Sequence, residues 1–293
     1  MSDSHMDGAI FLGLITHSES KYLNTYGKHE NFANLVKDLN VERSFVHDIN
    51  ATDASLEKIV VRDEVISICV LMKSLTQTQL RLLLKSNFHN FLLFTYHILS
   101  GIYSTMKLLF KLLISVFSLK YNQDYRRMIA RQHNISEAHI TQFSNSLVSN
   151  LTYSLILEDD FIMNKTYRLS ETLSKIVKFM EKSPDVKVLS ISESFSPKLL
   201  GFSKVSTYIP FEKLDFYKLS TPVTNTVSAM FYKTDILNQL IPILKSYRKY
   251  KIIPIDHKLN MAFVELGKVK ESNIHSLTYL SPGLFIQGSI HGD

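Results

Sequence analysis

Three consecutive carboxylates follow an apolar run in the stretch LTYSLILEDDFIM, residues 151–163. They are Glu158, Asp159 and Asp160. Adjacent carboxylates repel one another, so this cluster at the end of a strand is costly unless a cation neutralises it. Oxygen ligands of this kind suit Mg²⁺ or Mn²⁺, which also take phosphate oxygens and water. The stretch therefore predicts a divalent-cation site, and an acidic turn that caps the next helix is the alternative.

The spacing of the three acids predicts which of them can share a ligand. Side chains alternate between the two faces of an extended chain, which puts Glu158 and Asp160 on one face and Asp159 on the other. We therefore expect Glu158 and Asp160 to share one ligand. Asp159 is the least suited of the three to be a ligand.

The elements that must position these acids alternate between strands and helices. Apolar runs predict strands at 9–16, 43–48, 153–158, 186–192 and 224–232, and helical spacing predicts helices at 21–39, 166–183, 233–250 and 257–266. The first strand, helix and strand fit into about 40 residues, which is the start of a βαβ unit. The sequence thus predicts an α/β fold with a mixed, mostly parallel sheet flanked by helices, in a single domain over residues 1–293.

Three further segments have weaker patterns. Residues 56–72 predict a step from a helix to a strand that ends in VISICVLM. Residues 134–147 predict a helix that begins with Ser136 as its N-cap. Residues 195–225 contain three prolines and are expected to be rich in loops.

An apolar segment at about 80–120 stands apart as an expected helical insertion. Its polar residues recur at steps of three and four and include Lys107 and Lys111. Three interpretations are open: a membrane span, a helix or helical hairpin packed in the core, and a helix that lies on a membrane surface. Lysines and histidines interrupt every window of the length that a span needs.

Composition limits the classes of partner and compartment. The net charge of +6 and the pI near 9.1 suit acidic partners such as nucleotides or anionic lipid. The basic residues are dispersed without a recognition motif, so no nucleic acid is expected as a partner. A single cysteine, Cys69, allows no internal disulfide, and the polar start MSDSHMDG does not resemble a signal peptide. We therefore expect a cytoplasmic protein, with peripheral contact at a membrane as an option.

The stretch LILEDDFIM resembles the acidic motif at a strand end in nucleotide-sugar glycosyltransferases of the GT-A fold. It is most similar to glycosyltransferase family 25, the lipopolysaccharide biosynthesis type. Other stretches resemble the family in the same order along the chain: FLGLITHSESKYLNTYGKHENFANLV, NISEAHITQF, NTVSAMFYKTDILNQLIP, IPIDHKLN and SPGLFIQGSI. The resemblance covers most of the chain except about 72–122. It implies a GT-A-like, Rossmann-like sheet and a metal-dependent glycosyltransferase.

The resemblance also implies roles for the acidic motif. Asp160 would bind Mn²⁺ or Mg²⁺, which bridges the donor diphosphate and neutralises the charge of the leaving nucleoside diphosphate. Glu158 would lie near the ribose or sugar of the donor, and Asp159 is included with it in the donor site. His291 would be a further metal ligand near the end of the chain. An ordinary solvated terminal histidine is the alternative for His291.

The remaining site candidates surround the donor and the acceptor. Asp256 would be the general base of an inverting transfer, and an N-cap of the following helix is its alternative role. Residues expected to contact the donor are Thr16, His17, Asp48, Arg127, Glu137 and His139. Arg126 and Arg131 are expected to meet the diphosphate together with Arg127, and a basic solvated helix face is the alternative for these three arginines. Lys251 and Lys258 are weaker candidates. Lys107, Lys111 and Lys120 would meet anionic lipid if the apolar segment docks on a membrane.

The sequence therefore predicts transfer of a sugar from a nucleotide-diphosphate sugar, with UDP favoured, to a hydroxyl of a glycan or glycolipid. Synthesis of a surface polysaccharide or lipopolysaccharide is the expected setting. Two alternatives stay open: metal-dependent phosphoryl transfer by the same acids, and a membrane-associated scaffold of the same fold without turnover.

Overall fold

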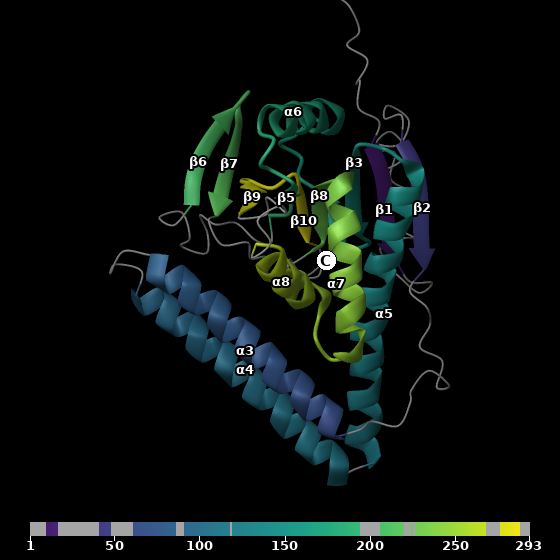
Figure 1. Ribbon diagram of the computed structural model, residues 1–293, viewed down its shortest axis with the longest axis vertical. Coiled ribbons are helices and arrows are strands. Elements are labelled where there is room, and N and C mark those ends of the chain that lie inside the picture. The colour runs from purple at the N-terminus through teal and green to yellow at the C-terminus, as the bar shows by residue number, and fades with distance from the viewer. Residues whose placement is uncertain are drawn as a thin grey trace, which may run out of the picture.

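The computed structural model describes residues 10–16, 41–47, 61–85, 91–117, 119–193, 206–219, 224, 227–267 and 276–287. These residues form an eight-stranded sheet and a small two-stranded sheet, with helices on both faces of the larger one (Figure 1). The strands are β1 (Ile10–Thr16), β2 (Val41–His47), β3 (Tyr153–Glu158), β4 (Phe161–Met163), β5 (Val188–Ser190), β6 (Ser206–Phe211), β7 (Leu214–Leu219), β8 (Ala229–Lys233), β9 (Leu277–Leu280) and β10 (Phe285–Gln287). The helices are α3 (Val61–Lys85), α4 (Phe91–Phe117), α5 (Leu119–Ser149), α6 (Leu169–Lys182), α7 (Leu237–Ser246) and α8 (Ile255–Leu266), with 3₁₀ turns η4 (Thr234–Ile236) and η5 (Tyr247–Lys249).

The larger sheet has the order β2-β1-β3-β8-β5-β9-β7-β6. Strands β8 and β7 pair antiparallel with their neighbours, so they run against the other six strands of this sheet. The prediction of an α/β fold with a mixed sheet between helices is confirmed. The helix expected at 21–39 lies outside the described residues.

The sheet reverses its winding direction beside β1. The chain passes from β1 to β2 on one side of it and then to β3 on the other side, and both strands pair with β1 in parallel. Adjacent strands whose connections leave in opposite directions form a topological switch point, and ligands of open α/β sheets bind outside the carboxyl ends of the strands there. At this place Ile15 of β1 lies opposite Glu158 of β3.

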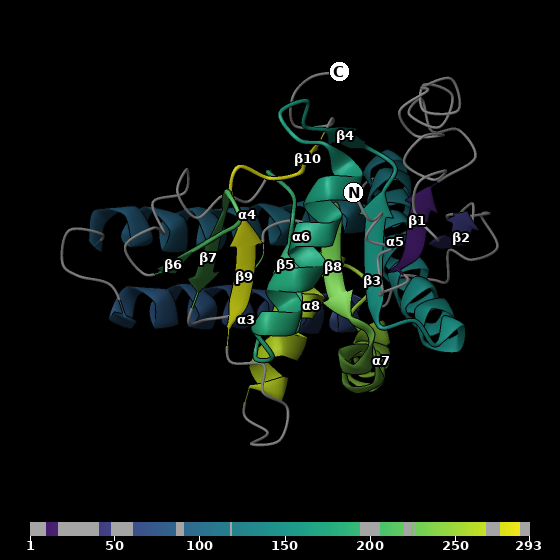
Figure 2. The same ribbon diagram turned by 90° about the horizontal axis from the view of Figure 1, so that it is seen from above.

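Alternation along the strands divides the core between the two faces of the sheet. Helix α6 covers one of these faces and lies in front of the strands in Figure 2. In β3, Leu155 and Leu157 pack in the cluster that contains the buried face of α6, while Ile156 packs in the cluster that contains α5, α7 and α8. The same division holds in β8, where Phe231 faces α6 and Met230 faces the other layer. Period-two alternation therefore puts the side chain of Glu158, two residues after Ile156, on the α5 side of the sheet.

Helices α3 and α4 form a hairpin that continues through α5 into the sheet domain (Figure 1). The strand predicted at the end of 56–72 is wrong, because Val61–Lys85 is one helix. Its Ile68 and Leu71 are buried in a cluster with Leu112 of α4 and Ile129 of α5. A short apolar run fits a buried strand and a buried helix equally well, so its partners decide between the two. The helical insertion therefore begins near residue 61 rather than 80.

Two other local predictions need correction. Ser136 is not an N-cap, because Leu119–Ser149 is one helix and the Ser136 hydroxyl donates to the Gln132 carbonyl oxygen (2.9 Å) inside it. Serine can bond back to the preceding turn in this way without ending a helix. The loop-rich stretch 195–225 contains the hairpin β6–β7, with Pro210 in the edge strand β6, where proline costs no ladder bond.

Phe143 links α5 to the sheet, and its loss is expected to destabilise the protein. The side chain has no exposed surface, and its ring meets that of Tyr232 edge-on at 5.2 Å between centroids. The Phe143→Ala variant should lose about 3–5 kcal/mol of unfolding free energy, because a large buried ring leaves a cavity. Urea unfolding measures this loss. Val148→Ala on the same helix is the control, since Val148 is 86% exposed, and a loss equal to that of Phe143→Ala would contradict the packing described.

Candidate functional site

The three acids lie at the carboxyl end of β3, at the switch point. Glu158 is the last residue of β3, and Asp159 and Asp160 form a turn before β4 begins at Phe161. The prediction that Glu158 and Asp160 share one face assumed that both lie in an extended strand. Asp160 lies in the turn, so the alternation of a strand does not apply to it. Asp160 is buried, with 9% of its surface exposed, and the Glu158 side chain is 21% exposed.

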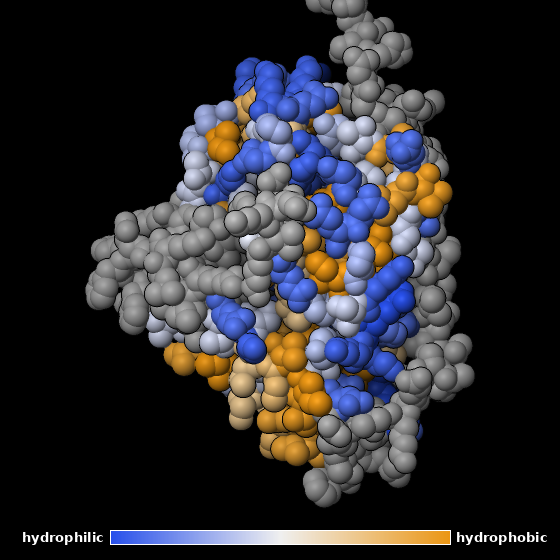
Figure 3. Space-filling model, in the orientation of Figure 1, coloured by the Kyte–Doolittle hydropathy of each residue, from blue (hydrophilic) through white to orange (hydrophobic). Residues whose placement is uncertain are grey.

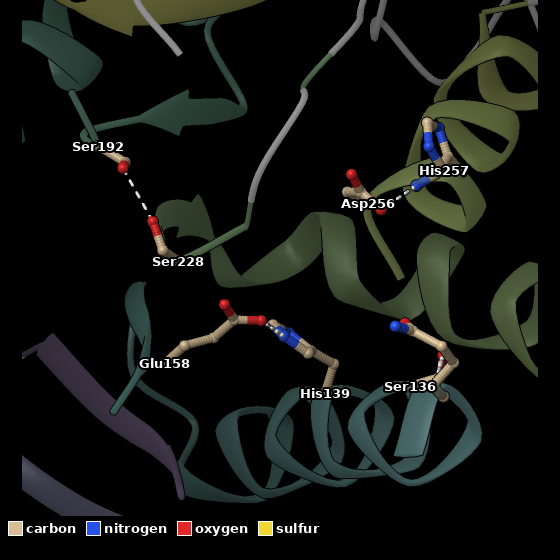
Figure 4. Close-up of polar contacts among 8 residues, drawn as sticks. Ser136, His139, Glu158, Ser192, Ser228, Asp256 and His257 are labelled. Carbon is tan, nitrogen blue, oxygen red and sulfur yellow. Dashed lines mark hydrogen bonds and ion pairs between the residues drawn. The ribbon is translucent and has the colours of Figure 1, made fainter. Parts of the chain in front are cut away.

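His139 of α5 holds the carboxylate of Glu158 (Figure 4). The His139 Nε2 to Glu158 Oε1 distance is 3.1 Å. An ionised carboxylate only accepts hydrogen bonds, so Nε2 is the donor when Glu158 is ionised. The imidazole is buried and meets the Phe143 ring edge-on at 6.0 Å between centroids. The structure thus brings together two residues predicted for the donor site, and it gives His139 the task of orienting Glu158.

Two serines that the sequence analysis missed fix the neighbouring strand ends. The backbone N–H of Glu158 donates to the carbonyl oxygen of Ser228 (2.9 Å), which directly precedes β8. The hydroxyls of Ser228 and Ser192 are 2.8 Å apart, and both side chains are buried (Figure 4). The signal in the sequence was only that each serine lies within a predicted strand. Together these bonds tie the ends of β3, β8 and β5 around the acids.

Glu137 is engaged away from the acids. Its carboxylate forms a two-pronged pair with Arg248 of η5, with Oε1 2.8 Å from Nε and Oε2 2.6 Å from Nη2. A guanidinium and a carboxylate in this geometry form a strong, oriented contact. The Glu137 carboxylate therefore joins α5 to η5, and it is already paired where a donor contact was predicted.

Arg127 is not brought to the acids. It precedes His139 by twelve residues on the same continuous helix, so it lies about 18 Å further along the axis at 1.5 Å per residue. Its side chain is 73% exposed and is 3.7 Å from Asp124. The expected diphosphate contact assumed that a new helix begins near residue 136. Instead, α5 runs without interruption from Leu119 to Ser149.

Asp256 lies in the first turn of α8, next to α5. The helix begins at Ile255 after Pro254, so the stretch IIPID is a turn and a helix start rather than an extended strand. The Asp256 carboxylate accepts the backbone N–H of His257 (2.9 Å) and does not cap the helix as predicted in the alternative role (Figure 4). A negative charge in the first turn of a helix is nevertheless favourable.

Lys258 connects the start of α8 to the His139 region. Its ammonium group donates to the Ser136 hydroxyl (3.1 Å), and Ser136 lies one turn before His139 on α5. The side chain is 1% exposed. Burial lowers the pKa of Lys258 to about 8, and the charge of Glu137 opposes this shift. Asp256 lies two residues before this lysine, in the first turn of α8.

The shifted pKa of Lys258 gives a dependence of stability on pH. Below pH 8 the buried ammonium is charged and costs stability, while between about pH 8 and 10.5 the unfolded chain binds more protons than the folded one, so stability rises with pH. The Lys258→Met variant lacks this cost. Its advantage in unfolding free energy over the wild type should be largest near pH 7.5 and shrink by up to roughly 3 kcal/mol as the pH approaches 10.5. Urea unfolding of both proteins across this range measures the difference, and a constant difference would contradict the assignment.

The other candidate residues lie at the border of the described structure. Thr16 ends β1 at the switch point, with its Cα opposite His47 of β2. His17, Asp48 and His291 lie outside the described residues. Strand β10 lies near the acids, because Gln287 pairs with Phe161, the residue after Asp160. The last described residue, Gln287, thus lies beside the acidic turn, and His291 follows it by four positions in the sequence.

The chemistry of the acidic turn fits a hard divalent ion. Carboxylate oxygens are the ligands that Mg²⁺ and Mn²⁺ prefer, with phosphate oxygens and water in the remaining positions. Among the residues that the structure describes, no group of three His, Cys, Asp or Glu side chains is placed to hold a metal ion by itself. Further donors to an ion at Asp160 could come from a bound phosphate group, water or residues outside the described ranges.

A comparison of the chain with protein-family models and with curated proteins finds no match.

Proposed function

We propose that the protein is a metal-dependent glycosyltransferase of the GT-A type, related to family 25. It transfers a sugar from a nucleotide-diphosphate sugar, with UDP favoured, to a hydroxyl of a glycan or glycolipid. One observation carries the proposal: the acidic turn Glu158–Asp160 lies at the carboxyl end of β3, at the switch point of an open α/β sheet. Nucleotides bind such sheets at this place, and the acids are suited to the metal of a diphosphate donor.

The donor would lie over the ends of β1 and β3. The nucleoside would meet the end of β1 at Thr16 and His17, with Asp48 after β2 as an acceptor for a base N–H. Glu158, held by His139, would accept a hydroxyl of the ribose or sugar in a fixed orientation, since its carboxylate is already oriented in the absence of substrate. Preorganised acceptors of this kind avoid the cost of ordering during binding.

Asp160 and His291 would hold Mn²⁺ or Mg²⁺. When bound, the metal ion stabilises the charge that develops on the leaving nucleoside diphosphate. The burial of Asp160 and the end of β10 beside it support this assignment.

Asp256 would receive the proton of the acceptor hydroxyl as that oxygen attacks the anomeric carbon on the face opposite the leaving group. Its place at the start of α8, two residues before the lysine that contacts α5, supports this role. The result is an inverted glycosidic bond, free nucleoside diphosphate and a proton on the carboxyl group.

Phosphoryl transfer by the same acids is the second candidate. It usually uses a glycine-rich loop that cradles phosphates, and the chain contains nine glycines but no G-x-x-x-x-G-K sequence. A scaffold without turnover would keep the sheet and would not need three acids at the switch point.

The setting that fits glycosyl transfer is polysaccharide or lipopolysaccharide synthesis at the cytoplasmic face of a membrane.

A thermal-shift screen separates these candidates. UDP-, GDP-, CMP- and dTDP-sugars and the nucleoside triphosphates are each tested with and without Mn²⁺, since a ligand that binds only the folded state raises Tm. We expect one nucleotide class to raise Tm, and to do so more strongly with Mn²⁺. No shift with any of the sugar nucleotides would favour the scaffold, and a shift with nucleoside triphosphates alone would favour phosphoryl transfer.

A further inference from the structure

Helix α4 carries an apolar face that the protein leaves in contact with solvent. The side chains on this face recur at steps of three and four, which places them on one side of the helix. The exposed residues are Leu99 (60%), Ile102 (37%), Tyr103 (69%), Met106 (55%), Phe110 (63%) and Leu113 (50%). Figure 3 shows hydrophobic surface along the edge of the molecule that the α3–α4 hairpin forms. These six residues are called the α4 apolar face.

The α4 apolar face is not needed to hold the hairpin in place. A different side of α4 contacts the protein, where Leu112 is fully buried in a cluster with Ile68 and Leu71 of α3 and Tyr125 of α5. Thr105 on that side is also buried. Soluble proteins rarely expose a continuous apolar surface of this size unless it binds something.

Lysines lie directly beside the α4 apolar face. At 100° per residue, Lys107 and Lys111 fall between the apolar face and the buried side, together with Ser100 and Ser104. All four side chains are exposed. Helix α4 contains no Asp or Glu, and the chain as a whole has a net charge of +6. A helix with an apolar face and lysines on its shoulder has the composition of helices that lie in the interface of anionic bilayers.

We propose that α4 docks the protein onto an anionic lipid surface, with its apolar face in the headgroup–acyl boundary and Lys107 and Lys111 at the phosphates. Aliphatic stems of lysine can lie along an apolar surface while the ammonium groups reach the headgroups. The helix lies along the membrane surface, because the lysines interrupt its middle and its other side is occupied by the protein. No helix in the described ranges is long and apolar enough to cross a membrane.

A second copy of the chain is the competing occupant of the α4 apolar face. Two such faces in a symmetric contact would bring lysines of like charge to one interface, on proteins that already repel one another through their net charge. An anionic surface instead attracts the same lysines, so charge favours lipid. Docking is independent of the proposed glycosyl transfer and is tested without any donor.

Vesicle flotation at low salt tests the proposal. The wild type should float with vesicles of equimolar phosphatidylcholine and phosphatidylglycerol, stay behind with phosphatidylcholine alone, and be released by high salt. The double variant Met106→Ser/Phe110→Ser should partition about tenfold less or weaker still, because two exposed apolar anchors are lost. The double variant Lys107→Glu/Lys111→Glu should lose about tenfold or more on anionic vesicles.

Matched controls separate this surface from general effects. Lys245→Glu/Lys249→Glu makes the same charge change at two exposed lysines of α7 and η5, and Val148→Ser removes an exposed apolar side chain from α5. Both controls should float like the wild type. Failure of the wild type to float, or equal flotation of all variants, would overturn the proposal. So would a dimer in sedimentation velocity that dissociates in Met106→Ser/Phe110→Ser while vesicles are ignored.

Discussion

The Asp160→Asn variant should turn over the donor at least about 100-fold more slowly than the wild type, because loss of a carboxylate ligand would weaken the hold on the metal ion whose charge stabilises the leaving diphosphate. Asparagine keeps the shape of the buried side chain and removes its negative charge, so the turn between β3 and β4 should stay intact. Release of nucleoside diphosphate in Mn²⁺ measures the loss. Unchanged far-ultraviolet circular dichroism and Tm show that the fold persists.

Asp159→Asn is the matched control for this prediction. It removes the same charge one residue away in the same turn, from an acid that is not proposed as a metal ligand. We expect its turnover to fall much less than that of Asp160→Asn. Equal losses in the two variants would mean that the total charge of the turn matters and not a ligand at Asp160, and full activity of Asp160→Asn would remove it from the metal site.

The Asp256→Asn variant should lose about 10²- to 10⁴-fold in kcat, the range that a general base contributes. The KM for the donor should change little, because the carboxylate would act on the acceptor and not on the nucleotide. Steady-state kinetics with saturating acceptor measures both effects.

A purely structural role for Asp256 predicts a different result. Its charge in the first turn of α8 would then contribute only about 0.3–1 kcal/mol to stability, with kcat unchanged. Asp235→Asn in the first turn of η4 is the control, since the Asp235 side chain is 63% exposed and pairs with Lys187. Loss of stability without loss of kcat in Asp256→Asn would assign the base to another residue.

The strongly patterned elements could be predicted from the sequence. Strand β3 was predicted from a continuous apolar run and helix α6 from an apolar pattern with a period of 3.6, and each was placed to within a few residues. The pattern failed where a short apolar run had two possible partners. VISICVLM became part of α3 because it packs against α4 and α5, a contact between distant segments that local periodicity does not contain.

In the candidate site, too, local features could be predicted and contacts between distant segments could not. The acids at the end of β3 were visible as a local feature, but their place at the switch point depends on the strand order β2-β1-β3, which the sequence analysis did not predict. The bond from His139 to Glu158 joins residues 19 apart, and that from Arg248 to Glu137 joins residues 111 apart. Such contacts depend on how α5 packs along the sheet, so the sequence pattern did not reveal that His139 orients Glu158 or that Glu137 is already paired.

The location of manganese in crystals grown with Mn²⁺ and the sugar nucleotide selected by thermal shift tests the central claim most directly. Anomalous scattering from the ion gives its position without reference to any assumed role. The account predicts a peak within direct coordination distance of the Asp160 carboxylate, bridged to the diphosphate, with the nucleoside over the end of β1. A nucleotide bound elsewhere, or manganese with no contact to Asp160, would contradict it.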